Sequence, residues 1–399
     1  MTTLAHWIPP ALTRDRLVAL QTWLAEHDFA AYVVTGVENA AYLSGWKPDV
    51  EPWERPIALL VPRRGDSALV LHELSVHGVR MARERGTLVV NDVMFYVERP
   101  APGGASRAKW GGLVAERLAA VGVPAAARVA CDALPAYLSE VAVAAPGVRL
   151  VADPSPLVDA RAVKAPEELA LMRAAASLTD FGQEVFFDLA RPGALIAEVD
   201  AETVRRMRVE AASRFPAADV TARAFSLTGP ASAAPHGTGA GSDAHIERGH
   251  GIVNIIIASL GGYFVENERT LFVGEPTPEQ RAAYACIREA QEAAVAACVP
   301  GATVAGIDRA ALAVIERHGY LGHVHHRAGH GIGLRGHDLP EDMAFNERPL
   351  RAGEVYTIEP GIYLWGIGGF RVDDTVVVGV PPEVLTTTPR DLAGVTLPG

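Results

Sequence analysis

The chain has 399 residues, a formal net charge of −11 at pH 7 and 49% hydrophobic residues. A chain of this length and composition is expected to form two globular domains that bury a sizeable core. The negative charge argues against nucleic acid or an anionic membrane surface as a partner.

The first ten residues lack both a basic start and a long apolar run, so no signal peptide is expected. No apolar stretch reaches the length of a transmembrane helix. Three cysteines (Cys131, Cys286 and Cys298) at unrelated spacings form no disulfide framework. Together these features favour a reducing cytoplasm as the location.

The first part of the chain alternates strand-like and helical segments. A helix is expected from Thr13 to about His27, and strand-like runs then recur as far as Cys131. This alternation predicts a smaller N-terminal α/β domain at residues 1–156, ending at a Pro-rich break. A second α+β domain is expected at 157–399, with long Ala-rich helices at Glu167–Leu189, Ile196–Arg214, Pro278–Val299 and Val304–His318.

The most informative segment is Gly262–Phe272, which reads G-Y-F-V-E-N-E-R-T-L-F. Aromatic and β-branched residues after a Gly-Gly turn predict a strand. Because strand side chains alternate, Glu266 and Glu268 project from the same face. Two like charges on one face of an apolar strand are costly unless a positive group lies between them. A metal ion or a cationic substrate, such as a guanidinium or an ammonium, would meet that need.

Two hairpins are predicted to bring further groups to these acids. A turn centred on Gly366 would place Glu359 opposite Asp373. A turn at Leu260-Gly261 would place Ile255 opposite Glu266. Between the two hairpins lies the segment G-H-G-I-G-L at 329–334, which contains His330 and is soon followed by His337.

These clusters resemble those of the "pita-bread" family of methionine aminopeptidases, Xaa-Pro aminopeptidases, prolidases and creatinases, and the resemblance covers nearly the whole chain. It implies that the second domain has the pita-bread fold. Peptidases of this family hold two metal ions on Asp, Asp, His, Glu and Glu. The last four positions match Glu266, His330, Glu359 and Asp373, whereas the first falls on Ile255. An aliphatic side chain cannot bind a metal ion, so at least one metal position should be lost.

The segment at 262–272 is most similar to creatinase, which cleaves a non-peptide C–N bond without metal. The Glu of its E-R-T motif matches Glu268, where peptidases usually have Thr. The resemblance makes His236, at the end of a loop of small residues, the general acid and base, a role that suits an imidazole. It also implies that His337 borders the substrate. Four other histidines are expected to be structural or solvent-facing: His245, His250, His325 and His326.

One N-terminal segment is implied to serve a neighbouring subunit. Trp53-Glu54-Arg55 aligns with a Phe-x-Arg of creatinase that reaches into the partner's site, where the Arg holds the substrate carboxylate. The resemblance therefore implies a homodimer with shared active sites that contain Trp53 and Arg55. The alternative for this segment is an exposed loop without a function.

These features favour a cytoplasmic, homodimeric, creatinase-like hydrolase that needs no cofactor. It would cleave a non-peptide C–N bond in a small amidine, urea, amide or cyclic amidine. Glu268 and Glu359 would hold the cationic group, and His236 would activate water and protonate the leaving nitrogen. The remaining groups expected at the substrate are Glu266, His330, His337, Asp373, Trp53 and Arg55.

Two alternatives remain open. The first is an Xaa-Pro dipeptidase or aminopeptidase in which one Mn, Co or Zn ion is held by Glu266, His330, Glu359 and Asp373. The second is an inactive protein that uses the fold to bind peptides. Retention of His236 and Glu268 beside the other site residues argues against this second alternative.

Overall fold

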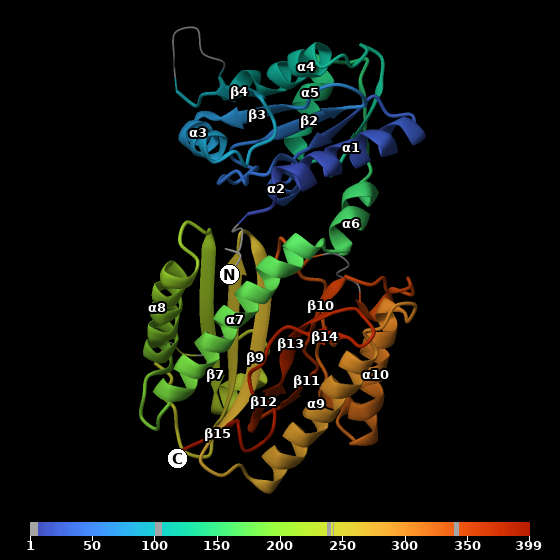
Figure 1. Cartoon of the computed structure of the whole chain (residues 1–399). Helices are drawn as coiled ribbons and strands as arrows, with labels where there is room; N and C mark the ends of the chain where they lie inside the picture. The colour runs from blue at the N-terminus through green and yellow to red at the C-terminus, as the bar shows by residue number, and fades with distance from the viewer. Residues whose placement is uncertain (1–6, 100–105, 238–240, 242, 339–342) are drawn as a thin grey trace. The chain divides into compact units, whose positions relative to one another are not determined.

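The computed structural model describes residues 7–99, 106–237, 241, 243–338 and 343–399. It divides into two compact units, Trp7–Ala160 and Arg161–Gly399, each of mixed α/β structure as predicted (Figure 1). The chain passes from one unit to the other within α6 (Ser155–Ala162), just beyond the break predicted after Pro156.

The first unit is built on a six-stranded sheet with the strand order β4-β3-β2-β1-β5-β6. Strand β2 pairs antiparallel with both β1 and β3, and the other neighbours are parallel. The strands are β1 (Ala31–Val34), β2 (Ala58–Pro62), β3 (Ala68–His72), β4 (Asp92–Tyr96), β5 (Arg128–Cys131) and β6 (Arg149–Ala152). The helices are α1 (Pro10–Glu26), α2 (Val37–Ser44), α3 (Val76–Arg85), α4 (Trp110–Ala120) and α5 (Ser139–Ala144).

The second unit contains a larger sheet in which β10, β13, β9, β8 and β7 lie side by side in that order. These strands are β7 (Val220–Thr228), β8 (Gly251–Leu260), β9 (Tyr263–Val273), β10 (Val355–Ile358) and β13 (Asp373–Val377). Short strands β14 (Glu383–Val384) and β15 (Thr396–Leu397) pair with β13 and β9. Strands β11 (Gly361–Leu364) and β12 (Gly368–Arg371) form a separate hairpin around Gly366, as predicted.

Four long helices cover the second unit. Helix α7 (Pro166–Leu189) packs on β8 and β9, and α8 (Ile196–Arg214) packs on β7 (Figure 1). Helix α9 (Pro278–Ala296) packs against α10 (Val304–Arg317) and contacts β10–β12. Pro166 and Pro278 stand in first helical turns, where a missing N–H costs nothing.

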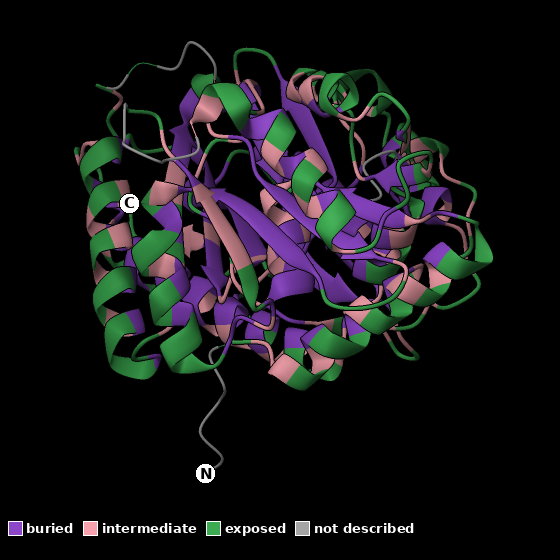
Figure 2. Cartoon of the chain, turned by 90° about the horizontal axis from the view of Figure 1, so that it is seen from above, coloured by how far each residue is buried: buried purple, intermediate pink, exposed green. Residues whose placement is uncertain are grey.

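The inner strands of both sheets are almost wholly buried, whereas the edge strands β4, β6 and β7 contain exposed or half-buried residues and many helices expose one side (Figure 2). All three cysteines are buried and none forms a disulfide, in agreement with their irregular spacing. Among the described residues, no helix combines the length and the apolar character needed to cross a bilayer.

Strand β7 is fixed to α8 by a half-buried carboxylate. The backbone N–H and the hydroxyl of Ser226 both donate to Asp200, over 2.9 and 2.6 Å. Burial raises the pKa of Asp200 to about 6, and the two hydrogen bonds only partly oppose this effect. The folded protein therefore holds a proton on this group more tightly than the unfolded chain does.

This raised pKa predicts a specific pH dependence of stability. The contribution of protonated Asp200 to the free energy of unfolding is fully present below pH 4. This contribution, roughly 3 kcal/mol in total, is lost as the pH rises from about 4 to 6. Asp200→Asn keeps an acceptor for the Ser226 N–H but does not titrate. The difference in unfolding free energy between wild type and variant, from urea denaturation at pH 4 and pH 7, should change by that amount. A constant difference would contradict the assignment.

Candidate active site

The ladder of the large sheet arranges the site residues in two rows across neighbouring strands. One row consists of Phe225, Ile255, Glu268 and Asp373, from β7, β8, β9 and β13 respectively. The adjacent row consists of Arg223, Ile257 and Glu266. Residues directly opposite one another share a face, so both rows point to the same side of the sheet.

The predicted pairing of Ile255 with Glu266 is wrong. The turn lies at Gly261-Gly262, both with positive φ, so Ile255 pairs with Glu268 and Ile257 with Glu266. A two-residue turn with φ > 0 at both positions matches the twist of the flanking strands. Because the shift is by two residues, Ile255 still shares the face of Glu266 and is its diagonal neighbour.

A cavity of about 700 Å³ lies over these rows. It is lined by six of the predicted site residues: His236, Glu266, Glu268, His330, His337 and Glu359. Asp373 is fully buried, and one of its oxygens lies within 4.8 Å of an oxygen of both Glu266 and Glu268. The structure therefore brings together groups that are separated by more than a hundred residues in the sequence.

His330 lies between two carboxylates. Its Nε2 is 3.5 Å from Glu266 Oε2 and 3.4 Å from Glu359 Oε1. Its Nδ1 contacts the carbonyl oxygen of Gly331 at 2.9 Å, which orients the ring, and the ring of His337 stacks on it at 3.7 Å. Burial alone would lower the pKa of His330, but Glu266 and Glu359 outweigh it and raise the pKa to about 9.

Arg371 supplies a positive charge that was expected from a ligand. Its Nε lies 2.5 Å from Glu268 Oε2, and both side chains are at most 4% exposed. Its Nη1 lies 3.9 Å from Glu359 and 3.4 Å from the hydroxyl of Tyr363, which also contacts His326 at 2.6 Å. Glu268, which was predicted to hold a substrate cation, is thus already paired within the chain.

Three acids of the cluster, Glu268, Glu359 and Asp373, differ in the direction or the cause of their pKa shifts. Burial raises the pKa of Glu268 although Arg371 opposes the effect, and burial with the charge of Glu268 raises the pKa of Asp373. Burial acts in the same direction on Glu359, but His330 and Arg371 outweigh it and lower its pKa. Arg371 and a protonated His330 together face the four carboxyl groups of Glu266, Glu268, Glu359 and Asp373, so the cluster still favours a further cation or proton.

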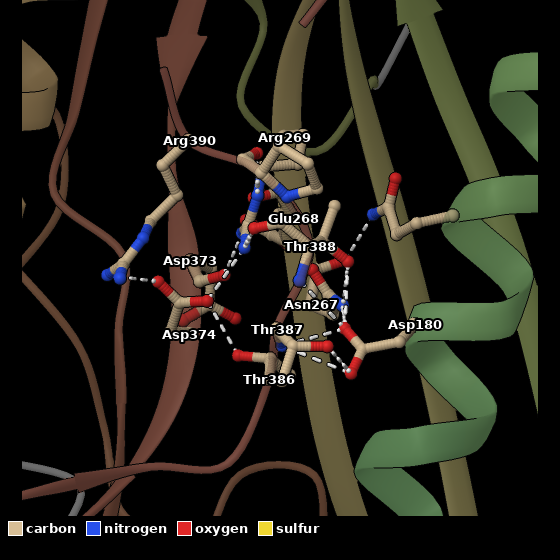
Figure 3. A network of polar contacts seen from close by, with 12 residues as sticks. Asp180, Asn267, Glu268, Arg269, Asp373, Asp374, Thr386, Thr387, Thr388 and Arg390 are labelled. Atoms are coloured by element: carbon tan, nitrogen blue, oxygen red, sulfur yellow. Dashed lines mark hydrogen bonds and ion pairs between the residues drawn. The ribbon is translucent and has the colours of Figure 1, made fainter. Parts of the chain in front are cut away.

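The opposite face of β9 holds the acids in place (Figure 3). Asn267 donates to Asp180 on α7 and to Thr388. Arg269 is fully buried, pairs with Asp374 at 2.8 Å and donates to the carbonyl oxygens of Asp373 and Thr388. The alternation of β9 therefore gives one face to the cavity and the other to a network of fixed polar contacts.

The structure places Trp53 and Arg55 in a turn of the first unit. The side chain of Trp53 is 76% exposed. Arg55 forms ion pairs with Glu54 at 2.8 Å and Glu98 at 2.9 Å. Their role in a neighbouring subunit stays a prediction.

Four titratable residues that line the cavity were not predicted from the sequence: Arg223, His326, Arg327 and Arg371. His326 was expected to be structural or solvent-facing, yet it lines the cavity and contacts Tyr363. The alternation of side chains along a strand could have indicated Arg371, because it lies two residues before Asp373 and so would share its face. Nothing in the local sequence of Arg223 distinguishes it from an exposed strand residue.

The cluster offers ligands for one metal ion. Oxygen atoms of Glu266, Glu268 and Asp373 lie within 4.8 Å of one another, although Glu268 is also paired with Arg371. Within the described part of the chain, His330 Nε2 and Asp373 Oδ2 are buried and make no hydrogen bond. With Glu266 and Glu359 they form a set of three carboxylates and one imidazole, which suits Mn, Co or Zn. Ile255 offers no ligand for a second ion. The expectation of a protein without a metal is therefore less well supported than the one-metal alternative.

Comparisons with known proteins agree with this fold and site. Residues 170–379 match the model of metallopeptidase family M24, and residues 16–163 match the creatinase/prolidase N-terminal domain. The chain belongs to metallopeptidase family M24 and is a hydrolase of that family.

Several of the proteins that this chain resembles are described as dipeptidases. The crystal structure of dipeptidase PepE from Mycobacterium ulcerans is 30% identical, covers 98% of this chain and 100% of its own, and has a TM-score of 0.82. An Xaa-Pro dipeptidase from Lactobacillus helveticus is 27% identical over 94% of this chain and 97% of its own. The Xaa-Pro dipeptidase of Pyrococcus furiosus is 35% identical, over 59% of this chain and 66% of its own. These similarities favour the peptidase alternative over the creatinase-like activity.

Proposed function

We propose that this protein is a peptidase for small peptides, of the Xaa-Pro dipeptidase or aminopeptidase type, and that it works with a single divalent metal ion. The observation that carries the proposal is the pair of buried donors, His330 Nε2 and Asp373 Oδ2, that make no hydrogen bond within the described chain. Their placement beside Glu266 and Glu359 suits ligands of one ion.

The chain's own residues have separable roles in this proposal. Glu266, His330, Glu359 and Asp373 would hold the ion, which when bound polarises a carbonyl group and makes a water more acidic. His236 is exposed at the cavity wall, where it would transfer a proton to the leaving nitrogen. Arg371 neutralises Glu268 and so limits the negative charge near the reacting bond.

A second candidate is the creatinase-like hydrolysis of a non-peptide C–N bond without metal. The observation that favours it is the aliphatic Ile255 beside Glu268, on the face that lines the cavity. The buried ion pair of Glu268 with Arg371 weakens it, because Glu268 is then less available to a cationic substrate.

Metal titration distinguishes the metal-dependent peptidase from the metal-free creatinase-like hydrolase. After chelation and dialysis, the wild type is expected to bind one Mn²⁺ per chain in calorimetry, and hydrolysis of L-alanyl-L-proline should need that ion. His330→Ala should abolish the binding, because one of four ligands is lost, whereas Ile255→Asp should add a second binding event. Turnover that survives chelation, with no bound metal, would contradict the peptidase proposal in favour of the creatinase-like one.

For the assembly we propose a homodimer in which the turn at Trp53 and Arg55 serves the partner's site. The high exposure of Trp53, a large aromatic side chain in a turn, supports this arrangement.

A further inference from the structure

Arg223 on β7 is an exposed cation at the cavity that the proposed chemistry does not use. It lines the cavity, and its guanidinium lies 4.5 Å from the centre of the Phe225 ring, two residues along the same strand face. Among the described residues, no carboxylate or hydrogen-bond acceptor pairs with it.

The other two arginines of the cavity are already engaged. Arg371 pairs with Glu268, and Arg327 donates to the carbonyl oxygen of Gly329 at 2.9 Å and lies 3.4 Å from His337 Nδ1. Arg223 therefore differs from them in having its charge available, while stacking on Phe225 limits the directions its side chain takes.

The ladder fixes the separation of Arg223 from the acids. Arg223 pairs with Ile257, and Ile257 pairs with Glu266, so one strand lies between the cation and the acid. Two strand spacings amount to about 10 Å. Ile255 and Ile257 on β8 form the apolar floor between them.

We infer that Arg223 binds a carboxylate of the substrate at the β7 end of the cavity. The substrate is then a small molecule with an anionic end at Arg223, an apolar part over Ile255 and Ile257, and the scissile C–N bond near Glu266 and Glu359. A free dipeptide with an apolar side chain has this arrangement. This inference rests on the proposed hydrolytic function for the position of the scissile bond.

The assignment differs from the one made for Arg55. Arg55 is engaged by Glu54 and Glu98 and would have to act on a partner's substrate. Arg223 belongs to the same chain as the acids and has no competing ion pair in the described structure. A planar guanidinium can donate two parallel hydrogen bonds to a carboxylate, which fixes the orientation of the ligand as well as its charge.

The test compares L-alanyl-L-proline with its neutral amide, L-alanyl-L-prolinamide, in the metal-loaded enzyme. Arg223→Gln should lower kcat/KM for the free dipeptide by about 5- to 100-fold, mainly through KM, a range that allows for partial exposure of the pair. The amide should be hydrolysed equally by both proteins, and Arg223→Lys should retain part of the preference. Arg208→Gln, a change at an exposed arginine of α8 that makes no ion pair with any described residue, should leave the hydrolysis of both substrates unaffected. Equal losses on both substrates, or no loss on either, would overturn the inference.

A binding measurement separates this inference from the proposed function. Wild type that hydrolyses neither probe would contradict the peptidase proposal. Calorimetry with N-acetyl-L-proline and N-acetyl-L-prolinamide then tests Arg223 alone. Tighter binding of the acid that disappears in Arg223→Gln supports the inference, whereas the absence of such a preference, including no measurable binding, overturns it.

Discussion

Replacing Arg371 by leucine is expected to lower the free energy of unfolding by about 3–5 kcal/mol, the usual cost of removing one partner of a buried ion pair. The change leaves Glu268 buried beside Glu266, Glu359 and Asp373 with no guanidinium between them. Urea denaturation of the chelated protein, followed by circular dichroism, measures the effect.

Two controls separate charge from packing. In the double variant Glu268→Gln/Arg371→Leu, most of the lost stability should return, because glutamine carries no charge. Arg173→Leu removes a similar Arg–Glu contact, to Glu383 at 2.7 Å, but both partners are nearly half exposed and the cost should stay below about 1 kcal/mol. A double variant as unstable as Arg371→Leu would show that lost packing, not unpaired charge, causes the effect.

Replacing His236 by alanine is expected to reduce kcat by about 10²–10⁴-fold, the usual contribution of a general acid or base. The imidazole lines the cavity, is exposed, and makes no hydrogen bond or ion pair within the described residues. Its removal should therefore change the unfolding free energy by less than about 0.5 kcal/mol. Steady-state hydrolysis of L-alanyl-L-proline and urea denaturation of the same preparations check both parts.

His77→Ala is the matched control, because His77 is also exposed but lies on α3 of the first unit. It should change neither rate nor stability. If His236→Ala instead lowers stability while each folded molecule keeps its activity, His236 is a structural residue and another group transfers the proton.

Much of the second unit could be predicted because the sequence patterns that define its helices and turns are local. Helix α8 spans Ile196–Arg214 as predicted, and the other three long helices differ only near their ends. The hairpin around Gly366 was predicted from its glycines. The register of β8 and β9 was not predicted correctly, because the adjacent glycines Gly261 and Gly262 allow several turn positions. The turn that forms depends on the φ angles of both glycines.

Part of the cavity lining could be predicted from the sequence, but its four further titratable residues and the ion pair of Glu268 with Arg371 could not. Glu266, Glu268, His330, His337, Glu359 and His236 do line one cavity. That Arg371 neutralises Glu268 depends on two strands, β9 and β12, that are distant in the sequence. That no described acidic side chain pairs with Arg223 is likewise a property of its surroundings, which the local sequence does not specify.

The polar network behind β9 also constrains the order in which the protein can be assembled during synthesis. Asp180, Arg269 and Asp374 are held by Thr386, Thr387, Thr388 and Arg390 (Figure 3). Strand β15 also pairs with β9, at Phe272 and Val273. These contacts form only after residues 386–397 have left the ribosome. A nascent chain that already contains every residue of the acidic cluster would still lack the contacts that support it, so the site becomes complete only when residues 386–390 and β15 pack against β9.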